Sequence, residues 1–258
     1  MIYHRAMSDE ILLAVADDVA TVTLNRPDTR NAMNAALLRA LAAVFDDLET
    51  RRDVRVVVVR GAGSAFCSGR DLREMEAREP QVDIVPVLRR VEASRHPTIA
   101  MIHGDAVAGG CELALHCDLR IAAEGARLGM PLARIGLVPG FALAQKLLEI
   151  IGPANTRHLL FTGRLIDARR ALAIGMVHEV VAAADVEKAT AALARTLADN
   201  APLSLAGIKA LLAQALAARD QVAHDDLDAL IQTARRSQDA SEGRRAMLEK
   251  RKPVFRGE

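Results

Sequence analysis

The fold of this chain is decided by the stretch Gly104-Asp-Ala-Val-Ala-Gly-Gly-Cys-Glu-Leu-Ala-Leu-His-Cys-Asp118. Two adjacent glycines, Gly109 and Gly110, stand at the start of a predicted short helix, and Glu112 falls in its first turn. The first N–H groups of a helix have no partner within the helix, and the helix dipole is positive at that end. Such a start suits an oxygen atom on which negative charge develops. The stretch therefore predicts half of an oxyanion hole.

A second glycine-containing turn is the candidate for the other half. It reads Ala65-Phe-Cys-Ser-Gly-Arg-Asp71, and it follows a valine-rich run at residues 54–59 that is the strongest strand signal in the sequence. Two strand-to-helix turns that each present a backbone N–H can hold one carbonyl oxygen between them. Together the two turns predict a site that grips a carbonyl group.

Up to residue 139, the spacing of apolar residues predicts strands that alternate with helices. A hairpin is expected at 11–16 and 19–24, helices at 34–48 and 82–93, and further strands at 54–59, 97–103 and 117–123. This alternation indicates an α/β core with right-handed crossovers.

After Pro139 the sequence is predominantly helical. Only residues 176–181 are predicted as a strand, and we place a soft boundary between an α/β core at 1–200 and a helical C-terminal region at 201–258. The helices are expected at 142–151, 153–161, 168–174, 185–199, 202–218, 221–236 and 241–250.

Composition argues against several classes of function. Lys and Arg (34) nearly balance Asp and Glu (33), and 2% of residues are aromatic, so the charge and stacking surface expected of a nucleic-acid partner are missing. Cys67, Cys111 and Cys117 cannot all pair and show no metal-ligand spacing, so we expect a reducing compartment and no metal. No run has the length of a membrane span, and the N-terminus lacks an apolar signal segment. These features predict a cytoplasmic protein with no membrane partner.

Several motifs occur in an order typical of one family. With these motifs over nearly its whole length, the chain resembles the enoyl-CoA hydratase/isomerase (crotonase) superfamily. They are Leu24-Asn-Arg-Pro27, Asn31-Ala-Met-Asn34, Ala65-Phe-Cys-Ser-Gly-Arg-Asp71, Gly109-Gly-Cys-Glu112, Gly136-Leu-Val-Pro-Gly140, Leu160-Phe-Thr-Gly163, Ala171-Leu-Ala-Ile-Gly-Met-Val177 and Lys250-Arg-Lys-Pro-Val-Phe255.

The resemblance implies a fold, a ligand and an assembly. The expected fold is α/β, a crotonase-like spiral of ββα units with a helical C-terminal region used for trimer formation. The expected partner is an acyl-CoA or enoyl-CoA thioester, with no cofactor beyond the coenzyme A of the substrate. The expected assembly is a homotrimer or a dimer of trimers.

The resemblance also assigns roles to particular residues. The oxyanion donors fall on the backbone N–H groups of Arg70 and Gly109, and Glu112 falls on the first of two glutamates with which hydratases of this family activate water. The remaining contacts, to the acyl group or to coenzyme A, fall on Arg26, Arg30, Ala32, Phe66, Ser68, Asp71, Leu132 and Phe141. The alternative interpretation of the two arginines is that they lie in a solvated turn. The alternative for the aspartate is that it stabilises a turn.

Leu132 is the main departure from the family pattern. It stands in the segment Met130-Pro-Leu132, where the second glutamate is normally found, and Phe141-Ala-Leu-Ala144 replaces a Gly-Gly-Thr run. Hydration needs one group that takes a proton from water and a source that delivers a proton to carbon. With Glu112 as sole acid/base, double-bond isomerisation is chemically easier. A hydratase, an enoyl-CoA isomerase and a non-catalytic acyl-CoA-binding protein therefore remain as alternatives.

Other polar residues near the two turns have structural interpretations. His116 lies one turn after Glu112 and is interpreted as a core histidine. Cys67 and Cys111 are interpreted as small packing residues, because no histidine is placed by sequence to activate either thiol. The basic tail segment Lys250-Arg-Lys252 is a further candidate contact for a phosphate of coenzyme A.

Overall fold

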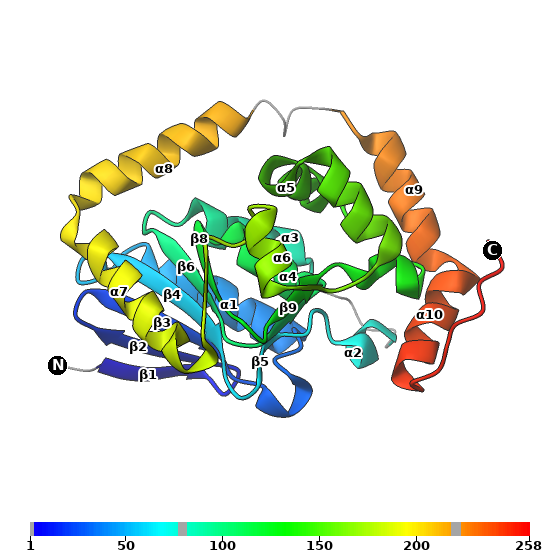
Figure 1. Cartoon of the computed structure of the whole chain (residues 1–258), viewed down its shortest axis with the longest axis horizontal. Coiled ribbons are helices and arrows are strands. Elements are labelled where there is room, and N and C mark those ends of the chain that lie inside the picture. Colours follow the sequence, from blue (N-terminus) through cyan, green and yellow to red (C-terminus); the bar gives the residue numbers. More distant parts are fainter. Residues whose placement is uncertain (1–2, 77–81, 218–222) are drawn as a thin grey trace.

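The computed structural model describes residues 3–76, 82–217 and 223–258 and is built around a seven-stranded sheet (Figure 1). Its first three strands form an antiparallel meander, and the remaining strands continue from the third in parallel. The hairpin and the later strands lie where the apolar pattern predicts them, whereas the first strand was not predicted. In sheet order the strands are β1 (Tyr3–Ser8), β2 (Ile11–Ala16), β3 (Val19–Leu24), β4 (Val56–Gly61), β6 (Thr98–Ile102), β8 (Leu119–Ala123) and β11 (Glu179–Val181).

The helices follow the predicted pattern closely, except that a short helix at 72–76 was not predicted. The helices predicted at 142–151 and 153–161 form one element with a kink at Gly152, whose φ is +69°. Residues 218–222 lie outside the described residues, and they include the expected end of one helix and the expected start of the next. The helices are α1 (Ala35–Leu48), α2 (Leu72–Glu76), α3 (Ile84–Ala93), α4 (Gly109–His116), α5 (Phe141–Thr162), α6 (Ala168–Ala173), α7 (Val186–Asp199), α8 (Pro202–Leu216), α9 (Asp225–Arg236) and α10 (Gln238–Leu248), with single 3-10 turns η1 (Pro27–Thr29), η2 (Pro131–Ile135) and η3 (Ala183–Asp185).

Strand β4 shows why the sheet is covered on both faces. Val56 and Val58 belong to the apolar cluster beneath α7, whereas Val57 and Val59 belong to the main core with α1, α3 and α4. Successive side chains of a strand point to opposite faces, so an unbroken run of valines needs an apolar layer on each side. The valine-rich run therefore accounts for the position of this strand inside the molecule.

A second, four-stranded sheet positions the two glycine turns. Its order is β10-β9-β7-β5, and β5 pairs in parallel with β7. Because parallel neighbours end at the same edge, the turns that follow β5 and β7 are brought to neighbouring places. The strands are β5 (Ala65–Cys67), β7 (Asp105–Val107), β9 (Arg127–Gly129) and β10 (Ile166–Asp167).

These short strands correct one prediction. The strand predicted at 176–181 is not the single strand after Pro139, because β10 at Ile166–Asp167 also follows Pro139 and pairs antiparallel with β9. A strand of two or three residues shows too little alternation to be read from apolar spacing. The predicted class, α/β with a helical C-terminal region, is confirmed.

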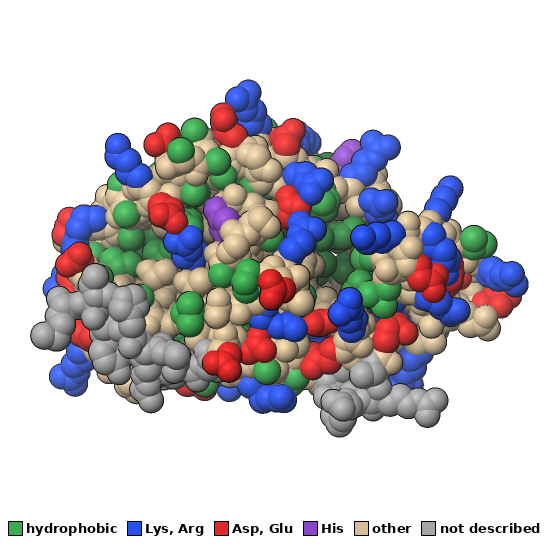
Figure 2. Space-filling view, turned by 90° about the horizontal axis from the view of Figure 1, so that it is seen from below, with side chains coloured by type: hydrophobic (Ala, Val, Ile, Leu, Met, Phe, Trp, Pro, Cys, Tyr) green, Lys and Arg blue, Asp and Glu red, His purple; other side chains and the backbone are tan. Residues whose placement is uncertain are grey.

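The helical C-terminal region lies at two ends of the molecule. Figure 1 shows α8 leading away from α7 on one side, with α9 and α10 on the other. Helix α10 contacts η2, where Gly243 lies against the backbone of Ile135. Figure 2 shows acidic and basic side chains interspersed over one face, in keeping with a net charge of +1. Among the described residues, every helix is too short or too polar to cross a membrane.

Candidate active site

The turns after β5 and β7 approach each other closely. A methyl group built onto Gly109 would lie 3.6 Å from the amide nitrogen of Arg70, and one built onto Gly69 would lie 3.2 Å from the amide nitrogen of Gly109. The residues before these two amides have left-handed backbone, with φ of +97° at Gly69 and +50° at Ala108. In each turn, the residue with positive φ therefore comes directly before the predicted oxyanion donor, which is the amide of Arg70 or of Gly109.

The N–H group of Arg70 takes no part in the β-bridge between Met33 and Arg70, and the N–H group of Gly109 takes no part in the hydrogen bonds of helix α4. The bridge between Met33 and Arg70 runs through the carbonyl of Gly69 and the N–H of Asp71. Gly109 is the first residue of α4, and the helical bonding begins further on, where the Glu112 N–H donates to the Ala108 carbonyl at 2.9 Å. Neither N–H group has an acceptor among the described residues, so both can donate to an acceptor from outside the chain.

Gly110 sets the position of α4 against β5. A methyl group at this residue would lie 2.1 Å from the carbonyl oxygen of Cys67, which is closer than any side chain can approach. The helix start therefore sits directly on the backbone of the neighbouring turn. A glycine is needed here because of the close approach rather than because of its φ.

Glu112 lies on α4 with 7% of its surface exposed. Burial raises the pKa of Glu112 to about 7, the nearby charge of Asp83 adds to the rise, and the cation of Arg70 opposes it. At neutral pH the carboxyl group is thus present in both protonation forms. A group with this pKa can both take and return a proton.

The side chain of Arg70 turns back into the protein. Its Nη1 donates to the carbonyl of Val82 at 2.7 Å, while Nε and Nη2 are buried and have no partner among the described residues. Burial lowers the pKa of Arg70, and the neighbouring carboxylates of Glu74, Asp83 and Glu112 oppose that change, while Arg235 adds to it. The guanidinium is therefore part of the electrostatic surroundings of Glu112.

Two of the predicted coenzyme A contacts, Arg26 and Asp71, form an ion pair with each other. Arg26 forms ion pairs of 3.0 Å with both Glu10 and Asp71, and it also donates to the carbonyl of Ala32. Asp71 accepts in addition from the N–H of Arg73 at the start of α2. These bonds fix the turn around Arg70.

Arg30 is more open than Arg26. Half of its side chain is exposed (52%), and its Nη2 lies 2.6 Å from Asp105, which also binds Arg127. Two cations share this one carboxylate, so the group carries a net positive charge. Ser68 donates to the carbonyl of Thr29, whereas Phe66 is fully buried in the main core.

Leu132 and Phe141 lie on the segment that follows β9. Leu132 is in η2, partly buried and packed against the main core. Phe141 is the first residue of α5, and its ring centroid is 4.2 Å from that of His224 in an edge-to-face arrangement. Both side chains are apolar, as the sequence indicates.

The residues interpreted as structural are buried. His116 donates from Nδ1 to the carbonyl of Glu112 at 2.8 Å, and its Nε2 is 3.8 Å from Glu92. Burial raises the pKa of both Cys67 and Cys111 to about 12, so neither is a thiolate at neutral pH. All three side chains are buried, as expected of packing groups.

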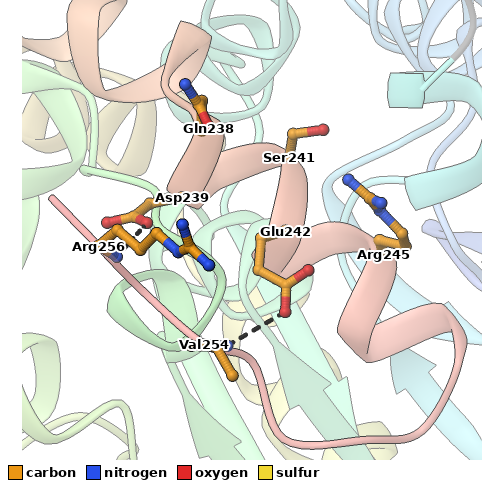
Figure 3. Close-up of a pocket in the computed structure, with 7 residues that line it drawn as sticks. All are labelled: Gln238, Asp239, Ser241, Glu242, Arg245, Val254 and Arg256. Carbon is orange, nitrogen blue, oxygen red and sulfur yellow. Dashed lines mark hydrogen bonds between the residues drawn. The ribbon is translucent and has the colours of Figure 1, made fainter. Parts of the chain in front are cut away.

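The basic tail is engaged with α10. Arg251 forms ion pairs with Glu242 and Glu249, and Glu242 also accepts from the N–H of Val254 (Figure 3). The pocket in Figure 3, of about 380 Å³, is lined by residues of α10 and the tail and contains none of the predicted site residues. Of the three tail cations considered for a phosphate, Arg251 is thus paired with acidic residues.

Sequence reasoning missed Asp83. It is the N-cap of α3, and its Oδ1 accepts from the N–H of Val85 at 3.0 Å. The predicted helix at 82–93 includes this residue, so its place at the helix start was not recognised. An aspartate followed by an apolar helix is the signal that identifies it.

Comparison with known proteins gives a consistent result. Residues 15–258 match the sequence model of a family described as enoyl-CoA hydratase/isomerase. The chain is 35% identical over 204 residues to the short-chain-enoyl-CoA hydratase of Clostridium acetobutylicum, covering 76% of this chain and 78% of that protein.

Two solved structures share the fold over almost the full length. The carnitinyl-CoA hydratase of Mycobacterium avium superposes with a TM-score of 0.87 at 31% identity, covering 97% of this chain and 100% of the other. A methylmalonyl-CoA decarboxylase superposes with a TM-score of 0.88 at 28% identity, covering 96% and 98%. Proteins of different named activities therefore have this same architecture.

Proposed function

The chain belongs to the enoyl-CoA hydratase/isomerase family, and on that basis we propose that it binds an enoyl-CoA thioester and moves a proton at a carbon near the thioester carbonyl. The observation that carries this proposal is the position of a buried carboxyl group on the same short helix whose first residue lies beside the Arg70 turn. The family acts on acyl-CoA thioesters, whose carbonyl oxygen is the acceptor that such N–H groups suit.

In the proposed reaction, the N–H groups of Arg70 and Gly109 donate to the thioester oxygen. Loss of a proton from the α-carbon, or addition of water at the β-carbon, places negative charge on that oxygen, and one such donor is worth about 3–4 kcal/mol in the transition state. Glu112 takes and returns the proton, for which its pKa of about 7 is suited. The coenzyme A of the substrate is the only cofactor in this proposal.

The remaining predicted contacts have distinct parts in the proposal. Arg30, half exposed beside Asp105, meets a phosphate of coenzyme A, with Ala32 and Ser68 on the neighbouring turn. Arg26 and Asp71 hold that turn in place through their ion pair. Phe66 supports the Arg70 turn from the core, and Leu132 and Phe141 give the acyl side its apolar character.

We also propose that the chain assembles as a homotrimer or a dimer of trimers through its helical C-terminal region. Helix α8 exposes Leu203 (80%), Leu211 (67%) and Leu212 (56%), a set of apolar side chains that a second copy would cover. Light scattering on the purified protein tests this: a mass of three or six chains supports it, and a monomer contradicts it.

A second candidate function is binding of an acyl-CoA without turnover. Leu132 favours it, because this side chain can neither accept nor donate a proton where the family's second glutamate is normally found. Two assays separate the candidates. Loss of conjugated thioester absorbance from a short trans-2-enoyl-CoA reports hydration, and gain of that absorbance from a 3-enoyl-CoA reports isomerisation.

Substitution of Glu112 tests the proposed chemistry directly. We expect Glu112→Gln to reduce turnover by about 100- to 10,000-fold, the usual contribution of an acid/base group, and to leave binding of a saturated acyl-CoA unchanged. Glu124→Gln is the matched control, because Glu124 is an exposed carboxylate paired with Arg169 on the surface. Equal turnover in Glu112→Gln and the unmodified protein would contradict the proposal, and binding without any turnover would favour the second candidate.

A further inference from the structure

Asp83 directly follows Val82, whose carbonyl accepts a hydrogen bond from the Arg70 guanidinium at 2.7 Å. It is exposed, and it precedes Ile84, whose Cδ1 would be 3.2 Å from a methyl group built onto Gly109. Helices α3 and α4, which carry Asp83 and Glu112, pack against each other. The two residues on either side of Asp83 therefore lie at the site: the Val82 carbonyl binds the Arg70 guanidinium, and the Ile84 side chain lies beside Gly109.

Only part of the Asp83 carboxylate is used by the fold. Oδ1 caps α3 by accepting from the N–H of Val85 at 3.0 Å, while Oδ2 has no hydrogen-bond partner within the described ranges. Among the described residues, the charged groups that act on Glu112 are Asp83 and Arg70, and Asp83 also acts on Arg70. The charges of these three side chains therefore influence one another.

We propose that Asp83 is the second acid/base residue of this site and supplies the carboxylate that position 132 lacks. The proposal rests on the proposed function, because it assigns a role in the same reaction. In that role Asp83 accepts a proton from water as the water oxygen bonds to the β-carbon of an enoyl-CoA. The electrons of the double bond move onto the thioester oxygen, and protonated Glu112 then delivers its proton to the α-carbon. Asp83 releases the water proton to solvent, and Glu112 is reprotonated from solvent.

The two carboxyl groups differ in a way that fits these roles. Glu112 is buried, and its pKa of about 7 leaves a share of it protonated at neutral pH. Asp83 is exposed, so water reaches it and carries its proton away. Two carboxyl groups in unlike surroundings commonly divide the acid and base roles.

Two reactions separate the roles of Asp83 and Glu112. Exchange of the α-proton of a saturated acyl-CoA in D2O needs Glu112 alone, whereas hydration of a trans-2-enoyl-CoA needs both residues. We expect Asp83→Asn to reduce hydration by about 100-fold or more while α-proton exchange persists. We expect Glu112→Gln to abolish both.

The chain offers a matched control for the helix cap. Asn caps a helix about as well as Asp, so Asp83→Asn keeps the start of α3. Asp167 is likewise the N-cap of α6 and accepts from the N–H of Arg170 at 2.7 Å, and Asp167→Asn makes the same change at the start of a different helix. We expect the Asp167→Asn variant to hydrate a trans-2-enoyl-CoA at the same rate as the unmodified protein.

The pH dependence of exchange is a second readout. Abstraction of the α-proton needs ionised Glu112, so exchange rises with pH and levels off above about 7, the pKa of Glu112. Removal of the negative charge of Asp83 lowers the pKa of Glu112, so the midpoint moves to lower pH in Asp83→Asn. Asp167→Asn leaves the midpoint in place. An unmoved midpoint in Asp83→Asn would overturn the inference.

The outcomes distinguish the two proposals. Unmodified protein with neither hydration nor exchange would overturn the proposed function, and this inference with it. Exchange without hydration in the unmodified protein, or full hydration in Asp83→Asn beside an inactive Glu112→Gln, would overturn only the role of Asp83. Loss of hydration with retained exchange in Asp83→Asn would support it.

Discussion

The turns around Gly69 and Gly110 differ from the segment of η2 and the start of α5 in how tightly each is packed. In the first region, Gly110 leaves no room for a side chain, since a methyl group there would lie 2.1 Å from the Cys67 carbonyl. In the second, a methyl group on Gly140 would meet no atom within 4 Å, and Leu132 and Phe141 are only partly buried. The turns around Gly69 and Gly110 are fixed by contacts between backbone atoms. The segment of η2 and the start of α5 is instead lined by partly buried side chains.

This difference separates two parts of the proposed reaction. Stabilisation of a charged oxygen needs donors that are already in place, because reorienting them during the reaction costs free energy. Choice of acyl group and of reaction depends on the side chains that face the carbon chain. The closely packed region therefore suits the step shared by the family, and the loosely packed region suits differences between its members.

Gly110→Ala gives the largest expected effect and would break the packed region. Because α4 must move away from Cys67, we expect a loss of about 1–3 kcal/mol in the free energy of unfolding. The displaced Gly109 N–H should also lower turnover by about 100- to 1,000-fold. Chemical denaturation and the enoyl-CoA assays measure the two effects.

Gly140→Ala is the matched change in the loosely packed segment. Gly140 has φ of −62° and ψ of 155°, which alanine adopts without strain, but it is also the N-cap of α5, where alanine is less favourable than glycine. These two effects oppose each other, so we expect the free energy of unfolding to change by less than about 1 kcal/mol. Equal losses of stability in the two variants would show that the contrast between the regions is wrong.

Leu132→Glu gives the next largest effect and sharpens the contrast on the acyl side. A carboxylate at this partly buried position adds a proton acceptor that the segment lacks, so we expect hydration to rise by roughly tenfold, which is less than the about 100-fold that a fully positioned acid/base group contributes. Leu132→Gln has nearly the same size without the charge and should give no gain. A gain in both variants, or in neither, would mean that a carboxylate at this position does not act on the substrate.

Much of the architecture could be predicted because its signals are long. The α1 helix spans several turns with regular apolar spacing, and β4 is a run of valines that only a doubly covered strand accommodates. The strands β5, β7, β9 and β10 have two or three residues each, and their pairing depends on distant segments. The sequence contains no local pattern for such pairing.

The candidate site divides in the same way. Arg70, Gly109 and Glu112 could be named from contiguous motifs, whereas the partners of Arg70 could not. Its bond to the carbonyl of Val82 depends on where α3 begins, and the nearness of Asp83 to Glu112 depends on how α3 packs against α4. Charged neighbours that come from separate elements are set by tertiary packing and leave no spacing to read.

Ala108→Gly gives the smallest expected effect and tests whether the packed region stores strain. Ala108 has φ of +50° and ψ of −123°, a conformation that glycine adopts far more easily than alanine. Relief of this strain should outweigh the greater freedom of glycine in the unfolded chain, for a net gain of about 1 kcal/mol and a rise in Tm of about 2–4 °C. Ala114→Gly, in the interior of α4, should instead lose about 1 kcal/mol. Equal destabilisation in both variants would show that Ala108 is unstrained, and the approach of the two turns would then come from packing alone.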